Sequence, residues 1–178
     1  MATVIGIRCA EGTVLAADRR VTSDDAVTSD GVRRVFEYDD AGAAVVGGVG
    51  AIEEFDRRFG TELDRSREES DDVHIDRIAQ VASELTGELG LDGLVVGLDS
   101  NGDVGLREVG SDGLVLASDV TALGSGASVA FGPLEQADTD RGLDDVEALA
   151  RETLSIVAQR DPDTGTDIDV VRFENGDD

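Results

Sequence analysis

The stretch Ala2-Thr-Val-Ile-Gly-Ile-Arg-Cys-Ala-Glu-Gly-Thr-Val-Leu-Ala-Ala-Asp-Arg-Arg20 decides the fold of this chain. Residues 3–9 and 13–18 are apolar or alternating runs on either side of Glu11-Gly12, a pattern that predicts a β-hairpin. The second strand ends in Asp18, which we expect to be buried. The sequence begins directly with this strand, so we expect that the terminal amine could serve as a base.

The remaining sequence predicts two pairs of helices separated by strands. Apolar residues recur at helical spacing from Ile52 to Leu63, over residues 73–89 and from Asp144 onward. The glycine-rich stretch Gly124-Ser-Gly-Ala127 is expected to lead into another helix that runs through Leu134. Asp144 and Glu147 have the spacing of a capping box. Two antiparallel sheets between two helical layers account for this order, so we expect a four-layer αββα sandwich of the α+β class, in one domain over 1–178. The further strands are expected at 32–36, 43–48, 94–98, 104–109, 114–117, 120–123 and 168–173.

The composition limits the class of protein. A length of 178 residues suits one domain with a sizeable core, which must be aliphatic because aromatic residues make up only 3%. No apolar stretch approaches the roughly 20 residues of a membrane span, and the first residues do not resemble a signal peptide. We therefore expect a cytoplasmic protein with no membrane partner. The single Cys9 is expected to be a buried thiol.

Acidic residues dominate the charge. There are 40 acidic residues against 15 basic ones, every basic residue is Arg, and the formal net charge is −25. Acid spread along the whole chain predicts adaptation to high salt, where self-repulsion is screened. Nucleic-acid binding is disfavoured, because contacts with phosphate need clustered Lys and Arg. No cluster of metal ligands is visible, no cofactor is expected, and His74 is expected at the surface.

Several short motifs follow one another along the chain. They are Gly6 with Glu11-Gly12, Val14 and Ala17-Asp18-Arg19-Arg20; Val46-Gly-Gly-Val-Gly50; Leu94 to Asp99; Gly124-Ser-Gly-Ala127 with Phe131-Gly132 and Leu134-Glu135; Ala150-Arg151; and Gln159-Arg-Asp161, Thr164-Gly165 and Ile168-Asp-Val170. In this order and at this spacing they resemble the β-type subunits of the proteasome core particle, which are N-terminal nucleophile hydrolases. The resemblance covers nearly the whole chain. The extra helical segment that precedes the first strand of α-type subunits has no counterpart here, and neither does the C-terminal helix of many members.

The resemblance implies a reaction and its partners. In active members the first residue of the mature chain is Thr, whose hydroxyl attacks a peptide carbonyl while its own α-amine takes the proton. Members assemble with one another into rings. We therefore expect this chain to associate with itself or with other proteasome-type subunits, with polypeptide as the possible substrate.

The family alignment places Ala2 at the nucleophile position, and a methyl group cannot attack a carbonyl. Removal of Met1 would leave Ala2 as the terminus. Thr3 would gain a free amine only if Ala2 were also removed. Since side chains alternate faces along a strand, Thr3 is expected to point away from the nucleophile's direction, as an ordinary strand residue.

The resemblance also assigns the partner positions. Asp18 matches the family's structural and catalytic Asp. Arg34 stands where the family has a Lys that pairs with this Asp and lowers the pKa of the terminal amine. Arg keeps the charge but is bulkier and does not give up its proton. Gly47 matches the residue whose backbone N–H stabilises the oxyanion, and Ala127 replaces a Ser near the amine. Asp161 and Thr164 match the Asp and Ser that hold the amine, although Asp161 also suits a turn after a helix.

Three hypotheses follow. The first is a β-type subunit that kept its fold and lost its nucleophile, because Ala2, Arg34 and Ala127 depart from the family. The second is a working threonine peptidase, which either uses a processed Thr3 or is translated from a different start codon. The third is a self-assembling relative with a role outside proteolysis.

Overall fold

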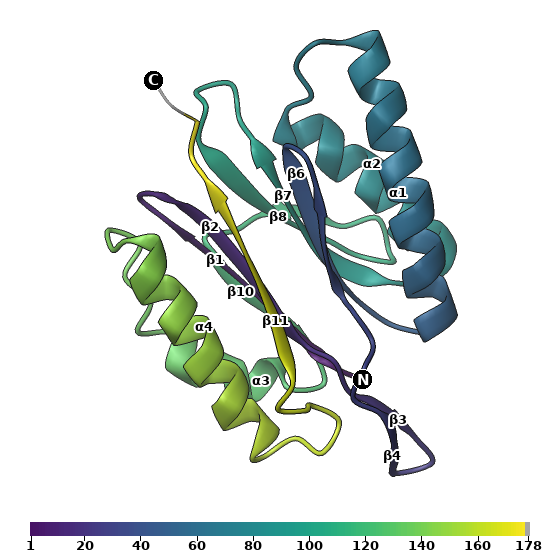
Figure 1. Ribbon diagram of the computed structural model, residues 1–178, viewed down its shortest axis with the longest axis vertical. Coiled ribbons are helices and arrows are strands. Elements are labelled where there is room, and N and C mark those ends of the chain that lie inside the picture. The colour runs from purple at the N-terminus through teal and green to yellow at the C-terminus, as the bar shows by residue number, and fades with distance from the viewer. Residues whose placement is uncertain (177–178) are drawn as a thin grey trace.

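The computed structural model describes residues 1–176 as two antiparallel sheets packed face to face between two helical layers (Figure 1). This confirms the predicted α+β, four-layer αββα sandwich. The first sheet has the strand order β10-β1-β2-β11, from Val120–Gly124, Thr3–Cys9, Gly12–Asp18 and Ile168–Glu174. The second has the order β5-β6-β7-β8-β9, from Val35–Tyr38, Ala41–Val46, Asp92–Leu98, Val104–Val109 and Val115–Ala117.

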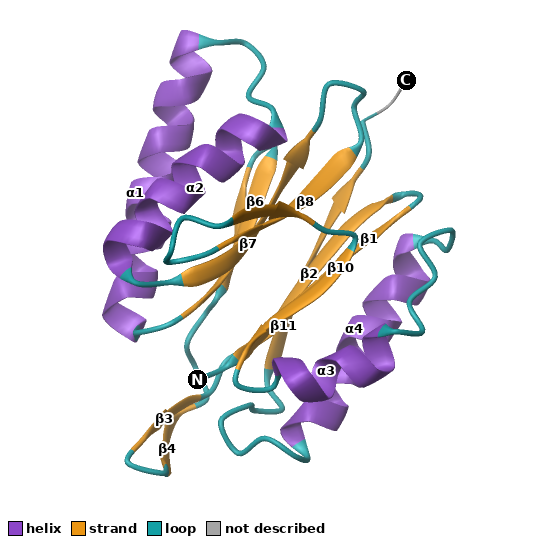
Figure 2. Cartoon of the chain, turned by 180° about the vertical axis from the view of Figure 1, so that it is seen from behind, coloured by secondary structure: helices purple, strands orange, loops and turns teal. Residues whose placement is uncertain are grey.

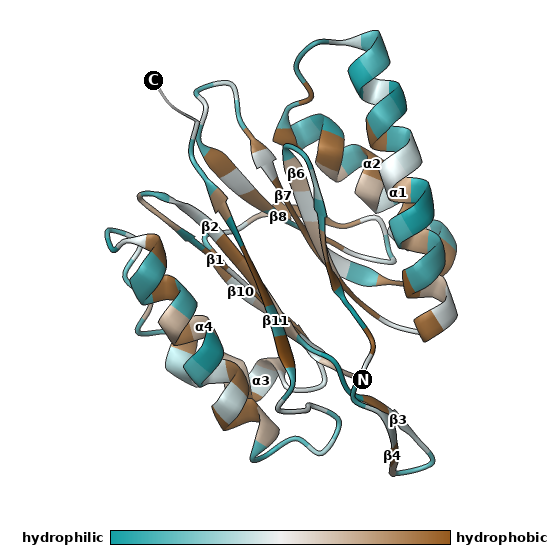
Figure 3. Ribbon diagram, viewed as in Figure 1, coloured by the Kyte–Doolittle hydropathy of each residue, from teal (hydrophilic) through white to brown (hydrophobic). Residues whose placement is uncertain are grey.

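Each sheet is covered on its outer face by one pair of helices. Helices α1 (Val49–Glu69) and α2 (Ile75–Leu89) lie on the five-stranded sheet, and α3 (Ala127–Leu134) and α4 (Leu143–Ala158) lie on the four-stranded sheet (Figure 2). The outward-facing turns of α1 are hydrophilic (Figure 3). No helix within residues 1–176 combines the length and the apolar character needed to cross a bilayer.

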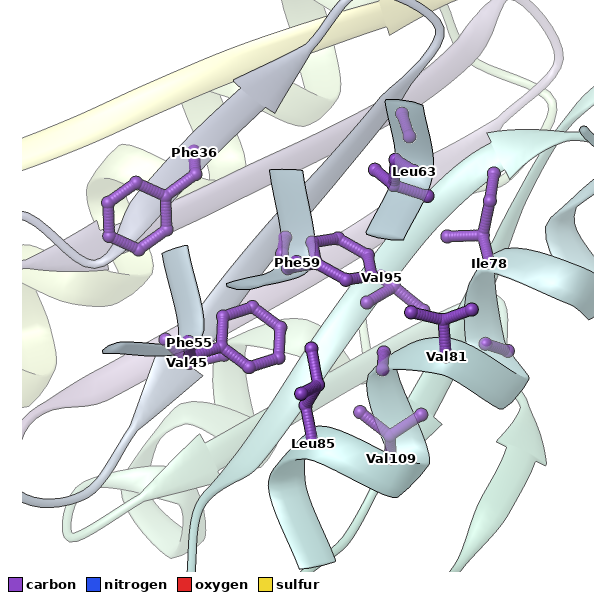
Figure 4. Packing of buried hydrophobic residues seen from close by; sticks show 14 of the residues in the cluster. Phe36, Val45, Phe55, Phe59, Leu63, Ile78, Val81, Leu85, Val95 and Val109 are labelled. Atoms are coloured by element: carbon purple, nitrogen blue, oxygen red, sulfur yellow. The ribbon is translucent and has the colours of Figure 1, made fainter. Parts of the chain in front are cut away.

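The core is aliphatic in three layers, as the composition predicts. Residues such as Val4, Leu15 and Leu106 fill the space between the sheets. Under α1 and α2, Phe55 and Phe59 stack with ring centroids 4.9 Å apart and point toward the strands (Figure 4). In the four-stranded sheet, β1 is an inner strand that pairs with β2 on one side and with β10 on the other.

Two predicted boundaries and one predicted cap are wrong. The strand expected at 32–36 begins only at Val35, and its partner spans Ala41–Val46 rather than 43–48. The capping box is also absent, since Gly142 is the N-cap of α4. The Leu143 N–H instead donates to Glu11 Oε2 at 2.8 Å, and the carboxylates expected to form the box accept hydrogen bonds from Arg172.

One element was not predicted at all. Strands β3 (Val21–Ser23) and β4 (Ala26–Ser29) form a two-stranded hairpin that projects from one end of the molecule (Figures 1 and 2). The N-terminus lies beside its base, while the described chain ends at the opposite end (Figure 1).

Candidate active site

Asp18 is the anchor of the site, at the end of β2 and fully buried. Its Oδ1 accepts the Thr3 N–H at 2.8 Å, and its Oδ2 accepts the N–H groups of Arg20 at 2.9 Å and Gly165 at 2.8 Å. Three segments distant in sequence therefore meet at one carboxylate. Charge-assisted hydrogen bonds of this kind are stronger than neutral ones, so the start of β1 is held firmly in place.

Arg34 lies next to Asp18, with only 3% of its surface exposed. Its guanidinium donates to the backbone oxygens of Asp18 at 3.3 Å, Val32 at 3.4 Å and Arg20 at 2.8 Å. Burial lowers the pKa of Arg34, and the negative charge of Asp18 partly offsets that effect. Arg34 is thus a carbonyl-binding cation that acts on the Asp18 carboxylate through its charge rather than through a direct hydrogen bond.

A chain of hydroxyl groups links β1 to the loop after α4. The Gly126 N–H donates to Thr3 Oγ1 at 3.0 Å, and Thr3 Oγ1 lies 2.8 Å from Thr164 Oγ1. Thr164 Oγ1 donates to Asp161 Oδ2 at 2.6 Å, so the Thr3 proton is directed to Thr164. The Ser125 hydroxyl donates to the same carboxylate oxygen of Asp161 at 2.6 Å. The Thr3 hydroxyl is therefore engaged as both acceptor and donor.

Ala2 lies at the entrance to β1, with 1% of its surface exposed. Its backbone oxygen accepts the Ser125 N–H at 3.2 Å. The approach is so close that a Cβ on Gly124, which has φ +100°, would lie 1.8 Å from the Ala2 oxygen. Glycine is therefore required at position 124 to let the glycine-rich turn reach the strand.

The α-amine of Met1 binds a residue that the sequence reasoning did not single out. It lies 3.0 Å from Asp163 Oδ2, and Asp163 Oδ1 accepts the Thr22 hydroxyl at 2.6 Å. The Thr22 hydroxyl and the ammonium group hold the pKa of Asp163 below its usual range. The turn motif Asp161-Pro-Asp-Thr-Gly165 was the only signal in the sequence that could have pointed to this carboxylate.

The two remaining predicted positions lie just before α1 and at the start of α3. Gly47, between β6 and α1, has φ +144°, and a Cβ there would lie 2.4 Å from Leu91 Cδ2. Only glycine suits that position. Ala127 is the first residue of α3 and is half-buried. His74 is the exposed N-cap of α2, away from this cluster, and no metal-binding group of His, Cys, Asp or Glu occurs within residues 1–176.

The structure thus brings five of the predicted residues into one connected cluster. Thr3 is bound to Asp18 through its backbone N–H and to Thr164 through its hydroxyl. Asp161 accepts the hydrogen bond of the Thr164 hydroxyl, and Arg34 donates to the backbone oxygen of Asp18. Chemically, the cluster can position a chain terminus and hold a buried negative charge. The roles that the resemblance assigns to these residues stay predictions.

Comparison with known proteins identifies the family. A family model described as "Proteasome subunit" matches residues 1–173. The chain belongs to the proteasome subunit family. It is 33% identical to proteasome subunit beta 1 of Thermococcus gammatolerans, over 95% of this chain and 87% of that protein. It is 29% identical to proteasome subunit beta of Methanohalophilus mahii, over 96% and 85%, and 27% identical to that of Natronomonas pharaonis, over 93% and 72%.

These relatives are β subunits, so they confirm the resemblance to β-type proteasome subunits that the sequence motifs indicated. Proteasome β subunits are threonine peptidases, and subunits of the family assemble into rings. The membership in the proteasome β-type subunit family that the motifs indicated is therefore confirmed.

The hydroxyl network predicts a measurable contribution to stability. Thr164→Val removes the hydroxyl that bridges Thr3 and Asp161 and leaves their polar groups short of a partner in a buried site. We expect a loss of about 1–3 kcal/mol in the free energy of unfolding, measured by urea denaturation. Thr166→Val, at an exposed position two residues away, is the matched control and should change it by less than about 0.5 kcal/mol. Equal effects of the two variants would contradict the assignment.

Proposed function

We propose that this chain is a non-catalytic β-type proteasome subunit that takes part in intracellular protein degradation by assembly rather than by cleavage. The observation that carries the proposal is Ala2, which occupies the position that the resemblance assigns to the nucleophile. An alanine side chain has no atom that can attack a carbonyl, whichever residue forms the mature terminus.

The surroundings of Ala2 support this proposal. Ala2 is buried and packs against the turn at Gly124, so the nucleophile position has become part of the packing of the four-stranded sheet. Arg34 gives its donors to backbone oxygens. Unlike a Lys, it cannot give up a proton or act in acid–base steps at neutral pH. These residues act as structural supports in our account.

A processed Thr3 is the competing proposal, and one observation favours it. The Thr3 proton has a route through Thr164 to Asp161, which resembles the path from a nucleophile to a base. Against it, Thr3 has no exposed surface, and its hydroxyl already accepts the Gly126 N–H. A peptide carbonyl could reach Thr3 Oγ1 only after the start of β1 separates from the glycine-rich turn.

Hydrolysis of fluorogenic peptides by matched variants tests the proposal. We expect the wild-type assembly and Thr3→Ala to give the same background rate. Thr166→Val is the control, because it removes an exposed hydroxyl outside the network of Thr3, Thr164 and Asp161. Cleavage by the wild type that persists in Thr166→Val and is lost in Thr3→Ala would overturn the proposal in favour of a threonine peptidase.

The partners follow from the family. We expect the chain to associate with itself or with other proteasome-type subunits, with polypeptide as the possible substrate. Native mass spectrometry of the chain, alone and mixed with proteasome subunits of a related organism, tests this expectation. Stable homo-oligomers that never take up a proteasome subunit would favour a self-assembling relative with a role outside proteolysis.

A further inference from the structure

Asparagine occurs at only two positions of this chain, 101 and 175, and glycine follows it at both. The fold brings these two Asn-Gly steps together. The Gly176 N–H donates to the Gly102 backbone oxygen at 2.8 Å, and the end of β11 lies beside the turn between β7 and β8 (Figure 1). The two steps therefore share one neighbourhood, and their own contacts distinguish them.

An Asn-Gly step can lose the amide of its asparagine in a reaction that consumes only water. The glycine nitrogen attacks Asn Cγ, and glycine has no side chain to hinder the approach. A C–N bond forms and closes a succinimide ring, the Cγ–Nδ2 bond breaks, and the amide nitrogen leaves as ammonia with the proton of the attacking nitrogen. Water then opens the ring to give aspartate or isoaspartate. The asparagine side chain must turn toward the next backbone nitrogen for this reaction to begin.

The side chain of Asn175 joins the two sheets. Its Nδ2 donates to the Ala10 backbone oxygen at 2.9 Å, and its Oδ1 accepts the Val104 N–H at 2.9 Å. Ala10 lies in the β1–β2 turn of the four-stranded sheet, and Val104 begins β8 of the five-stranded sheet. The Asn175 backbone N–H also donates to the Glu11 oxygen at 2.9 Å. We call these three hydrogen bonds the Asn175 clasp.

The clasp protects Asn175 from loss of its amide. Both ends of the amide are bound, so Cγ cannot turn toward the Gly176 nitrogen without breaking two hydrogen bonds. The Gly176 nitrogen is itself engaged by the Gly102 oxygen. The reaction at Asn175 therefore requires that the end of β11 first detaches from both sheets, which is a local opening of the fold.

Asn101 lacks this protection. It is exposed in the turn after β7, and its side chain forms no hydrogen bond within residues 1–176. Its backbone N–H donates to Asp99 Oδ1 at 2.7 Å, which holds the turn but not the amide. The Gly102 N–H donates to the Asp99 backbone oxygen at 3.1 Å, so the attacking nitrogen is restrained at this step but the side chain is not.

Conversion of Asn175 would prevent the clasp from closing again. An aspartate side chain accepts hydrogen bonds but does not donate them at neutral pH, so the Ala10 oxygen would lose its donor. The new negative charge would also enter a hollow of about 220 Å³ that already holds several carboxylates. The charged residues that line this hollow with Asn175 are Arg8, Asp103, Asp119 and Asp140.

We propose that the two Asn-Gly steps are deamidation sites with opposite protection. Asn101 converts to aspartate and isoaspartate in the folded chain, whereas Asn175 converts only after the end of β11 detaches, and its conversion keeps the clasp open. This inference does not depend on whether the chain cleaves peptides.

Peptide mapping by mass spectrometry tests the proposal on the wild-type chain. The chain is incubated in molar KCl at mildly alkaline pH, both folded and in urea, and loss of the amide is followed at the two sites. Because two more hydrogen bonds oppose the reaction at Asn175, we expect it to be at least about tenfold slower there than at Asn101 in the folded chain. In urea the two rates should become similar.

Three results of this experiment would overturn the proposal. The first is a folded chain in which Asn175 reacts as fast as Asn101 or faster. The second is an Asn101 that reacts only in urea, because the folded turn would then protect it. The third is an Asn175 that remains slow in urea, because its protection would then not come from the clasp.

Two substitutions test the consequence of conversion. Asn175→Asp should lower the melting temperature in molar KCl by about 2–4 °C, the size expected for one net hydrogen bond in a chain of this length. Asn101→Asp adds the same charge in the exposed turn and is the matched control, which should stay within about 1 °C of the wild type. Equal melting temperatures of the two variants would show that the Asn175 amide does not hold the sheets together and would overturn the clasp.

Discussion

Replacing Asp18 with Ala is expected to lower the free energy of unfolding by about 3–5 kcal/mol, the usual cost of removing one member of a buried charge pair. The variant leaves the N–H groups of Thr3, Arg20 and Gly165 without an acceptor. It also leaves the buried Arg34 cation without its neighbouring negative charge. Urea denaturation in molar KCl measures the loss.

Two further variants keep this test informative if Asp18→Ala does not fold. Asp18→Asn keeps one acceptor oxygen and the side-chain volume but removes the charge, so we expect a smaller loss than for Ala. Asp167→Ala, at an exposed site near the same loop, is the matched control and should change stability by less than about 0.5 kcal/mol. A loss for Asp18→Ala no larger than that of the control would contradict the anchoring role of Asp18.

Lowering the salt concentration is expected to destabilise the fold strongly. The 15 arginines cannot neutralise 40 carboxylates, so the excess negative charge repels itself when it is not screened. The screening length is about 3 Å in 1 M salt and about 30 Å in 0.01 M salt. Between 2 M and about 0.05 M KCl we expect the melting temperature to fall by more than about 10 °C, or about 3–5 kcal/mol for a chain of this size.

Sucrose separates screening from general stabilisation in this experiment. It favours compact states by exclusion from the protein surface but does not screen charge. We therefore expect sucrose at low salt to restore only a minor part of the lost melting temperature. A melting temperature that is the same at low and molar KCl would contradict adaptation to high salt.

The elements that the sequence predicts well are those with regular apolar patterns. The hairpin of β1 and β2, the helices and the order of the layers all follow from such patterns, and their boundaries agree to within a few residues. The β3–β4 hairpin escaped prediction because its short, exposed strands carry no apolar alternation. The cap of α4 escaped because its acceptor, Glu11, lies in a turn far away in sequence.

Some features of the site could likewise be predicted from the sequence, and others could not. The burial of Asp18 was predictable, since it directly follows an apolar strand. The burial of Arg34 had no signal, because Arg is almost always exposed unless its charge is paired. The contact between Thr3 and Thr164 joins residues 161 positions apart and exists only because β11 lies next to β2 in the sheet. Long-range polar contacts of this kind have no local sequence pattern.

The most direct test of the central claim, that this proteasome β-type chain has lost its nucleophile, is whole-protein mass spectrometry after treatment with an electrophilic peptide inhibitor that reacts with an N-terminal threonine. An active subunit from a related organism, treated in parallel, shows that the reagent works. Our account predicts no covalent adduct on this chain and no peptide hydrolysis above background. A single adduct at Thr3, with hydrolysis that the inhibitor abolishes, would contradict it.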